Sequence, residues 1–150
     1  MKPLFLDRRL LQLRMQSAYQ TLRGFPSCHP QRIGAIGFCF GGLAVIELFR
    51  SGTPVRGVVS FHALLGNALG DLQAETVPIA DGIKGSILAQ HGHDDPLVTP
   101  EDIACFQSEL TRAEVDWQFY VYGRTSHAFT NPHANEPGKG LIYNQKSSTR

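Results

Sequence analysis

The sequence predicts an α/β fold in which a mostly parallel sheet of about four strands is flanked by helices. Short apolar segments of strand length alternate with longer segments of helical character, which is the pattern that βαβ units produce. A glycine-flanked cysteine joins the first apolar strand directly to a helix. Reactive residues follow three of the four strands, as expected where parallel strands end at one edge of a sheet.

The chain is expected to begin with an amphipathic helix. Apolar residues recur at helical spacing among arginines and glutamines, and they are Leu6, Leu10, Leu13, Ala18 and Leu22. Gly24 and Pro26 then end the pattern, because neither residue continues a helix well. We therefore expect an amphipathic helix over residues 6–22.

The next segments predict one strand, one helix and a second strand. An apolar run indicates a strand over 32–38, and a helix follows from about 40 to 51, where Gly52 and Pro54 stop it. The short apolar segment 55–61 predicts the next strand. These elements form a βαβ unit, which is right-handed by default.

The second half predicts two further strands and one helix. Residues 62–84 show no clear period and are interpreted as an excursion that shapes a pocket, before a strand over 86–90. Pro100 opens a helix that runs to about Arg112, and alternation over 116–122 indicates the fourth strand. The tail from Asn131 is polar and rich in glycine.

Length and composition limit the class of protein. The 150 residues fit a single domain over 1–150, and the formal net charge of +1 predicts neither a nucleic-acid partner nor an anionic membrane surface. No signal peptide and no stretch of about 20 apolar residues is found, so we expect a cytoplasmic protein without membrane contact. The three cysteines lack paired spacing, which predicts neither a disulfide framework nor a metal site.

Residues 37–42, with the sequence GFCFGG, have the pattern of a nucleophile elbow centred on Cys39. In such a turn, side chains two positions away would collide with backbone, so Gly37 and Gly41 are expected to prevent collisions. The following helix would favour the thiolate of Cys39, and the N–H of Phe40 would form half of an oxyanion hole. The alternative interpretation is a small buried, inert cysteine.

A cysteine nucleophile needs a base, and the base needs a carboxylate that orients it. His127 follows the fourth strand and is the candidate base, against the alternative of a solvated loop histidine. Asp94 and Asp95 both follow the third strand, and the spacing from Gly92 favours Asp95. Nucleophile, acid and histidine then occur in the chain order of the α/β-hydrolases.

Two further patterns in the sequence contain histidine. His62 follows the second strand and is a candidate to line the substrate pocket, although a hydrogen-bonded structural histidine fits equally well. The segment 91–95, HGHDD, also matches HxHxD, which begins a dinuclear metallohydrolase motif. Pro96 occupies the next expected ligand position, so a metal centre is only a minor alternative.

Four segments together resemble the dienelactone hydrolase family of α/β-hydrolases. They are GFCFGG at 37–42, VSFH at 59–62, HGHDDPLV at 91–98 and SHAFTNP at 126–132. The resemblance runs from about residue 5 to the end and implies hydrolysis of a small-molecule ester or lactone without a cofactor. Carried over residue by residue, it assigns the catalytic triad to Cys39, Asp95 and His127.

The family pattern also includes segments that this chain lacks. It implies several strands before the nucleophile strand, one with a loop that donates the second oxyanion-hole N–H, and a closing C-terminal helix. We therefore expect a partial α/β-hydrolase, truncated at both ends, that self-associates through an exposed apolar strand edge. The main alternative function is a non-catalytic remnant or subunit of a hydrolase.

One family position bears on the substrate. The resemblance implies an arginine four residues after the histidine, where it would hold a substrate carboxylate, and this chain has Asn131 there. The resemblance therefore does not carry recognition of a carboxylated dienelactone over to this chain.

Overall fold

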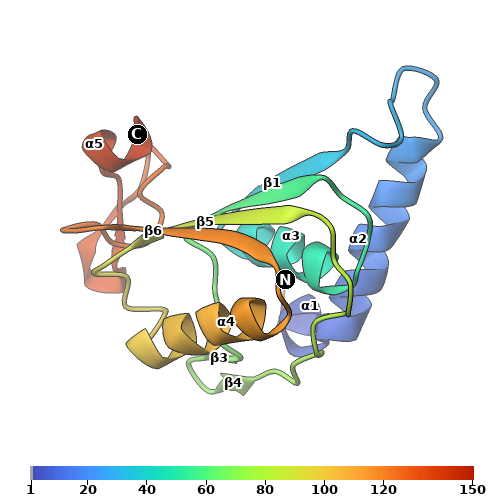
Figure 1. The fold of residues 1–150 in the computed structure, drawn as a ribbon. Coiled ribbons are helices and arrows are strands. Elements are labelled where there is room, and N and C mark those ends of the chain that lie inside the picture. Colours follow the sequence, from blue (N-terminus) through green and yellow to red (C-terminus); the bar gives the residue numbers. More distant parts are fainter. Residues whose placement is uncertain (1) are drawn as a thin grey trace.

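The computed structural model, which describes residues 2–150, contains a four-stranded parallel sheet flanked by helices (Figure 1). The sheet order is β1-β2-β5-β6, with the strands β1 (Gly34–Phe38), β2 (Gly57–Phe61), β5 (Ser86–Gly92) and β6 (Asp116–Tyr122). The three longer helices are α2 (Arg8–Arg23), α3 (Phe40–Arg50) and α4 (Pro100–Arg112). The expected fold class, with its mostly parallel sheet of about four strands, is thus confirmed.

The order of the strands explains why the helices gather on one side. Each strand after β1 in this sheet pairs in parallel with the strand of the same sheet that precedes it along the chain, so successive right-handed crossovers all fall on the same face. Figure 1 shows α3 and α4 beneath that face, with α2 beside α3. The opposite face carries exposed Ile36 and Phe38 of β1 and exposed Tyr120 of β6.

The register brings the carboxyl ends of the strands together. Phe38 pairs with Phe61, and Phe61 pairs with Gln90, so β1 and β2 end at the same level beside β5. The next residues continue this alignment, since the Cys39 N–H donates to the Phe61 carbonyl and the His62 N–H donates to that of Gln90. Residues that follow different strands therefore meet at one edge.

The predicted first helix is divided in two. A short helix, α1 (Lys2–Leu6), precedes α2, and Asp7 between them caps α2 by accepting a hydrogen bond from the N–H of Leu10. Asp7 has extended backbone angles, which end the first helix and begin the second. The helix expected from residue 6 therefore begins at Arg8.

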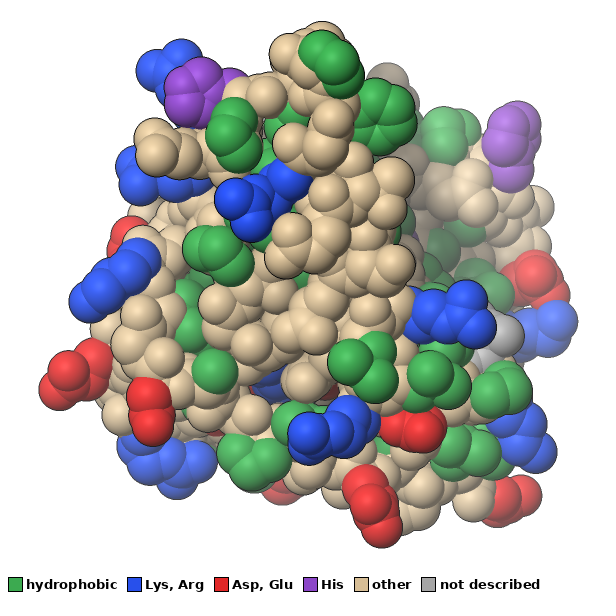
Figure 2. Space-filling view, turned by 90° about the vertical axis from the view of Figure 1, so that its right-hand side faces the viewer, with side chains coloured by type: hydrophobic (Ala, Val, Ile, Leu, Met, Phe, Trp, Pro, Cys, Tyr) green, Lys and Arg blue, Asp and Glu red, His purple; other side chains and the backbone are tan. Residues whose placement is uncertain are grey.

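The buried face of α2 differs from the face that the apolar residues mark. Leu13 is 57% exposed and Leu22 is 43% exposed, whereas Leu11 and Tyr19 are buried. Figure 2 faces the side of the molecule where α2 lies and shows apolar side chains exposed among basic ones. The buried face packs on α3, where Gln12 is also buried because its side chain donates to a buried carboxylate, that of Glu47. Hydrophobic periodicity missed this face because some of its positions are polar.

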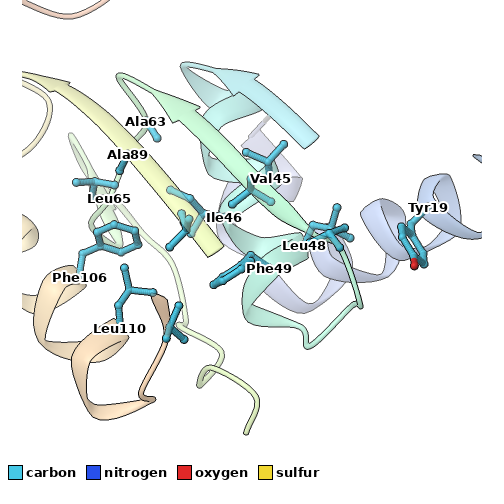
Figure 3. Close-up of a cluster of buried hydrophobic side chains, with 14 of the residues drawn as sticks. Tyr19, Val45, Ile46, Leu48, Phe49, Ala63, Leu65, Ala89, Phe106 and Leu110 are labelled. Carbon is cyan, nitrogen blue, oxygen red and sulfur yellow. The ribbon is translucent and has the colours of Figure 1, made fainter. Parts of the chain in front are cut away.

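The main core lies between the sheet and helices α3 and α4. Figure 3 shows Phe49 of α3 near Phe106 and Leu110 of α4, all of them fully buried or nearly so. The α4 helix has the predicted bounds, because Thr99 and Asp102 form a capping box and Pro100 occupies the first turn.

The remaining elements are short. The excursion 62–84 contains an antiparallel pair, β3 (Ala68–Leu69) and β4 (Leu72–Gln73). The tail contains β7 (Asn135–Glu136), the 3₁₀ turn η1 (Pro137–Lys139), β8 (Leu141–Ile142) and α5 (Gln145–Ser148). Two-residue strands are too short to produce a period in the sequence. Within residues 2–150, no helix has the length and apolar character needed to span a bilayer.

Candidate active site

Cys39 occupies a strained turn between β1 and α3. Its backbone angles are φ 54° and ψ −120°, in a region that residues other than glycine rarely adopt. The turn brings Gly37 so close to Gly41 that a Cβ added to Gly37 would fall on the Gly41 carbonyl group. Glycine at position 37 is thus required by the tight turn, as expected from the sequence.

The second expected glycine is a different one. A Cβ added to Gly41 meets nothing within 4 Å, so the prediction that Gly41 prevents a collision was wrong. The crowded position is Gly42, where a Cβ would lie 2.9 Å from both Ala63 Cβ and Ser60 Oγ. The first turn of α3 lies against the residues that end and follow β2, and this contact depends on tertiary packing.

The turn brings Cys39 into contact with His127 and, through it, with Asp95. The Cys39 Sγ lies 3.1 Å from His127 Nε2, and His127 Nδ1 lies 2.7 Å from Asp95 Oδ2. The other carboxylate oxygen of Asp95 accepts the N–H of Leu97, and Asp95 is buried, whereas Asp94 is exposed. Of the two candidate acids, only Asp95 contacts the histidine.

Two loops hold the acid and the histidine together. The N–H of Asp94 donates to the carbonyl of Thr125, joining the loop after β5 to the loop after β6. Gly92 makes this approach possible, since a Cβ there would collide with the Thr125 carbonyl oxygen. The carbonyl of His127 accepts the N–H of Ile142, so β8 of the tail supports the histidine from the other side.

The contacts among Cys39, His127 and Asp95 shift the pKa values of His127 and Cys39. Burial disfavours charge on His127, but hydrogen bonds to Asp95 and Cys39 outweigh it and raise the pKa of the imidazole to about 9. The hydrogen bond from His127 also lowers the pKa of the Cys39 thiol, against its burial, and the N–H of Phe40 acts in the same direction. The pair therefore favours thiolate and imidazolium, helped by the positive end of α3.

His62 lies beside this group of residues. Its Nε2 is 2.8 Å from Thr130 Oγ1, and its ring meets the edges of His127 and Phe129 at centroid distances of 5.0 and 5.1 Å. Burial lowers the pKa of His62 to about 4, and the neighbouring His127 adds to this effect. His62 is therefore neutral near pH 7, and it fits both expectations, because it lines the pocket and is hydrogen-bonded.

An open pocket of about 510 Å³ borders Cys39. Its polar lining residues are Cys39, His62, His127, Thr130 and Asn131, and its apolar lining residues are Phe38, Ala128, Pro132 and Leu141. Phe40 contributes its N–H at the cysteine, while its side chain packs against the smaller hydrophobic cluster under α1 and α2. Sequence reasoning did not select Thr130 or Leu141, although Thr130 lies in the SHAFTNP segment.

The HxHxD interpretation finds no geometric support. The ring of His91 is buried against Phe119 at a centroid distance of 6.0 Å, and Asp95 is directed to His127. Within residues 2–150, no three His, Cys, Asp or Glu side chains converge as metal ligands would. Of the residues in this motif, Asp95 instead contacts His127, and His91 packs as a buried ring near Phe119.

A parallel sheet that ends in a cysteine elbow, followed by an acid and a histidine on later loops, defines the α/β-hydrolase class. Residues 2–150 match the dienelactone hydrolase family, and the chain belongs to that family. A solved dienelactone hydrolase-like promiscuous phosphotriesterase from metagenomic libraries is 36% identical, with a TM-score of 0.88 over 100% of this chain and 60% of that one.

Two curated relatives are also similar. An uncharacterised protein of Caenorhabditis elegans is 30% identical over 93% of this chain and 86% of its own length. The human carboxymethylenebutenolidase homolog is 26% identical over 69% of this chain and 39% of its own length. The chain therefore spans most of the nematode relative but well under two thirds of the human one.

Proposed function

We propose that this chain hydrolyses small carboxylic esters or lactones with a catalytic triad of Cys39, His127 and Asp95. The observation that carries the proposal is the continuous line of contacts from the Cys39 sulfur, through both nitrogens of His127, to the Asp95 carboxylate, at 3.1 and 2.7 Å. Membership of the dienelactone hydrolase family and similarity to a carboxymethylenebutenolidase homolog support the substrate class.

The first half-reaction forms a thioester. The Cys39 thiolate attacks the carbonyl carbon, and the N–H of Phe40 stabilises the negative charge that develops on the carbonyl oxygen. The tetrahedral intermediate then collapses and breaks the bond to the alkoxide. The His127 imidazolium gives its Nε2 proton to that alkoxide, so an alcohol leaves and His127 becomes neutral.

The second half-reaction releases the acid. Neutral His127 takes a proton from water, and the resulting hydroxide attacks the thioester carbonyl. The C–S bond breaks, the carboxylic acid leaves, and the thiolate and imidazolium are restored. Throughout, the Asp95 carboxylate accepts a hydrogen bond from the Nδ1–H of His127, and this bond keeps Nε2 directed at the sulfur.

Hydrolysis of 4-nitrophenyl acetate tests the proposal. Cys39→Ala should lose at least about 100-fold in kcat/KM, because no other side chain supplies the nucleophile. Cys105→Ala is the matched control, since this cysteine is exposed on α4 and should keep wild-type turnover. Circular dichroism establishes that each variant is folded.

The alternative of a non-catalytic remnant predicts a different result. If folded wild type, Cys39→Ala and Cys105→Ala all release 4-nitrophenol at the buffer rate, the hydrolase proposal is rejected. If Cys39→Ala hydrolyses 4-nitrophenyl acetate at the wild-type rate, the ester reacts elsewhere on the protein and the triad assignment is wrong.

We also propose that the chain works in the cytoplasm. Cys28, Cys39 and Cys105 are all free, and a thiolate nucleophile persists best where the surroundings are reducing. Fractionation of cells expressing the tagged chain tests this, and recovery from an oxidising compartment would contradict it.

The free edge of β1 supports the expectation of self-association. β1 lies at one end of the sheet, and Ile36 and Phe38 on it are 61% and 47% exposed. A second copy would pair with this edge, because unpaired strand groups and apolar side chains favour strand addition. In sedimentation velocity, Ile36→Lys should convert the dimer to monomer. Tyr120→Lys on β6 is the control. If only Tyr120→Lys dissociates the dimer, the interface lies elsewhere.

A further inference from the structure

The pocket beside Cys39 offers a substrate very little positive charge. Among its lining residues, all within the described part of the chain, there is no lysine or arginine, and only the two histidines can become cationic. The remaining polar groups are the thiol of Cys39, the hydroxyl of Thr130 and the amide of Asn131. The apolar residues of the lining add no charge.

The charge of His127 is already balanced. Its Nδ1 is directed at the Asp95 carboxylate and its Nε2 at the Cys39 sulfur, so neither N–H is free for a substrate. Whether the shared proton lies on the Cys39 sulfur or on His127, these two residues are neutral as a pair, and the Asp95 carboxylate gives the three residues one net negative charge. An anion in the pocket would meet this charge at short range.

His62 does not offset this negative charge. It is only 2% exposed, its Nε2 is engaged with Thr130, and its ring packs against those of His127 and Phe129. Protonation would place a second cation beside the His127 imidazolium in a buried position, and the pKa of His62 of about 4 reflects this cost. At neutral pH His62 therefore acts as an uncharged wall of the pocket.

We infer that this site selects uncharged esters and lactones and rejects substrates that carry a carboxylate within a few bonds of the scissile carbonyl. This inference rests on the proposed function. Two like charges about 6 Å apart in surroundings of effective dielectric about 20 repel strongly enough to lower association about 100-fold. The discrimination therefore arises from charge, and the apolar lining adds affinity for the neutral chain.

A matched pair of esters tests the inference. 4-Nitrophenyl butanoate and mono-4-nitrophenyl succinate share the leaving group and nearly the same acyl length, and they differ by a terminal methyl or carboxylate. Acylation of Cys39 is measured from the 4-nitrophenolate released in the first turnover and from the mass of the peptide that contains Cys39. Each rate is divided by that of a free thiol, which removes intrinsic reactivity. The butanoate should acylate Cys39 about 100-fold faster.

Asn131 provides the matched variants. It is exposed and lines the pocket, so Asn131→Arg adds a cation at the rim, whereas Asn131→Gln extends the side chain without charge. Both variants lose the hydrogen bond that the Asn131 side chain accepts from the N–H of His133. Asn131→Arg should raise succinyl acylation at least about 10-fold relative to butanoyl, and Asn131→Gln should leave the ratio unchanged.

Every other outcome of this experiment rejects either the charge selection or the proposed function. Equal normalised rates in wild type overturn the charge selection and leave the hydrolase proposal standing. A ratio that Asn131→Arg and Asn131→Gln change equally shows that shape, and not charge, discriminates. If neither ester acylates Cys39 in folded protein, the proposed function fails and the inference falls with it.

Discussion

His62 Nε2 lies 2.8 Å from Thr130 Oγ1, so the residue that follows β2 is hydrogen-bonded to the segment that follows His127. His62 adopts a positive φ of 37°, which turns the chain away from the strand at this point. The bond joins two loops that are 68 residues apart in sequence, beside the cysteine elbow. Loop positions at the carboxyl edge of the sheet are therefore held by contacts with one another as well as by the strands.

Replacing His127 should change the reactivity of Cys39. His127→Ala removes the hydrogen bond that most lowers the pKa of the thiol, so alkylation by iodoacetamide should move to higher pH and slow about 10-fold near pH 7. Peptide mass mapping over pH 5–10 measures this, with exposed Cys105 as the internal reference. An unchanged Cys39 profile would show that the 3.1 Å contact does not control the thiolate.

Ester acylation should fall at alkaline pH. The pKa of His127 is raised to about 9, so the imidazolium that protonates the leaving group is present below that pH and is lost as pH rises through it. Stopped-flow acylation with an ethyl ester, whose alkoxide needs the proton, should decline above about pH 9. A 4-nitrophenyl ester is the control, because its leaving group needs no proton and its acylation should stay level.

Glycines 37 and 41 should respond differently to alanine. Gly37→Ala forces a Cβ against the Gly41 carbonyl, and overpacking against backbone should lower the free energy of unfolding by about 3 kcal/mol or prevent folding. Gly41→Ala has open space in the first turn of α3 and should be neutral or stabilising by up to about 1 kcal/mol. Urea unfolding measures both, and equal losses would refute the packing explanation.

The buried His62 should make stability depend on pH. Its pKa is about 4 in the folded chain and about 6.5 when unfolded, so the unfolded state binds the proton first as pH falls. Stability should therefore decrease from pH 6.5 toward pH 4, by about 2 to 3 kcal/mol from this residue. In His62→Gln, the decrease in the free energy of unfolding, measured with urea, should be smaller by that amount. If the free energy of unfolding falls with pH equally in wild type and His62→Gln, His62 is not the group responsible.

The buried ion pairs of Arg50 should contribute to stability. Its guanidinium joins the fully buried Glu47 of α3, at 2.8 Å, to Glu109 of α4, at 2.5 Å. Arg50→Met leaves the Glu47 carboxylate buried without its cation, which should cost about 3 to 5 kcal/mol. Adding Glu47→Gln should recover at least half of that loss. Chemical denaturation measures both, and no recovery would mean that packing rather than charge dominates.

Local patterns predicted the sheet and the elbow because their causes lie within a few residues. The GFCFGG sequence contains the strand end, the turn and the helix start, and the α4 helix begins at a capping box within four residues. Residues that follow parallel strands share one edge, which makes His127 and the Asp94–Asp95 pair candidates, and the spacing from Gly92 favours Asp95. The structure then brings His127 into contact with both Asp95 and Cys39.

Distant partners explain what sequence reasoning missed. Gln12 is buried because Glu47 accepts its hydrogen bond, which no periodicity can predict. Gly42, and not Gly41, is crowded because Ala63 lies against it. Thr130 and Leu141 line the pocket through the path of the tail, whose two-residue strands carry no pattern.

The sequence by itself determined the α/β class, the order of strands and helices, and the residues from which a nucleophile, a base and an acid could come. These properties depend on side-chain period, glycine and proline positions and chain order, which are local. Only the tertiary structure decided which face of α2 is buried, that Gly42 rather than Gly41 is crowded, and that His62 is neutral in the pocket wall. Those properties depend on distances and burial between segments far apart in the chain, which a linear pattern does not contain.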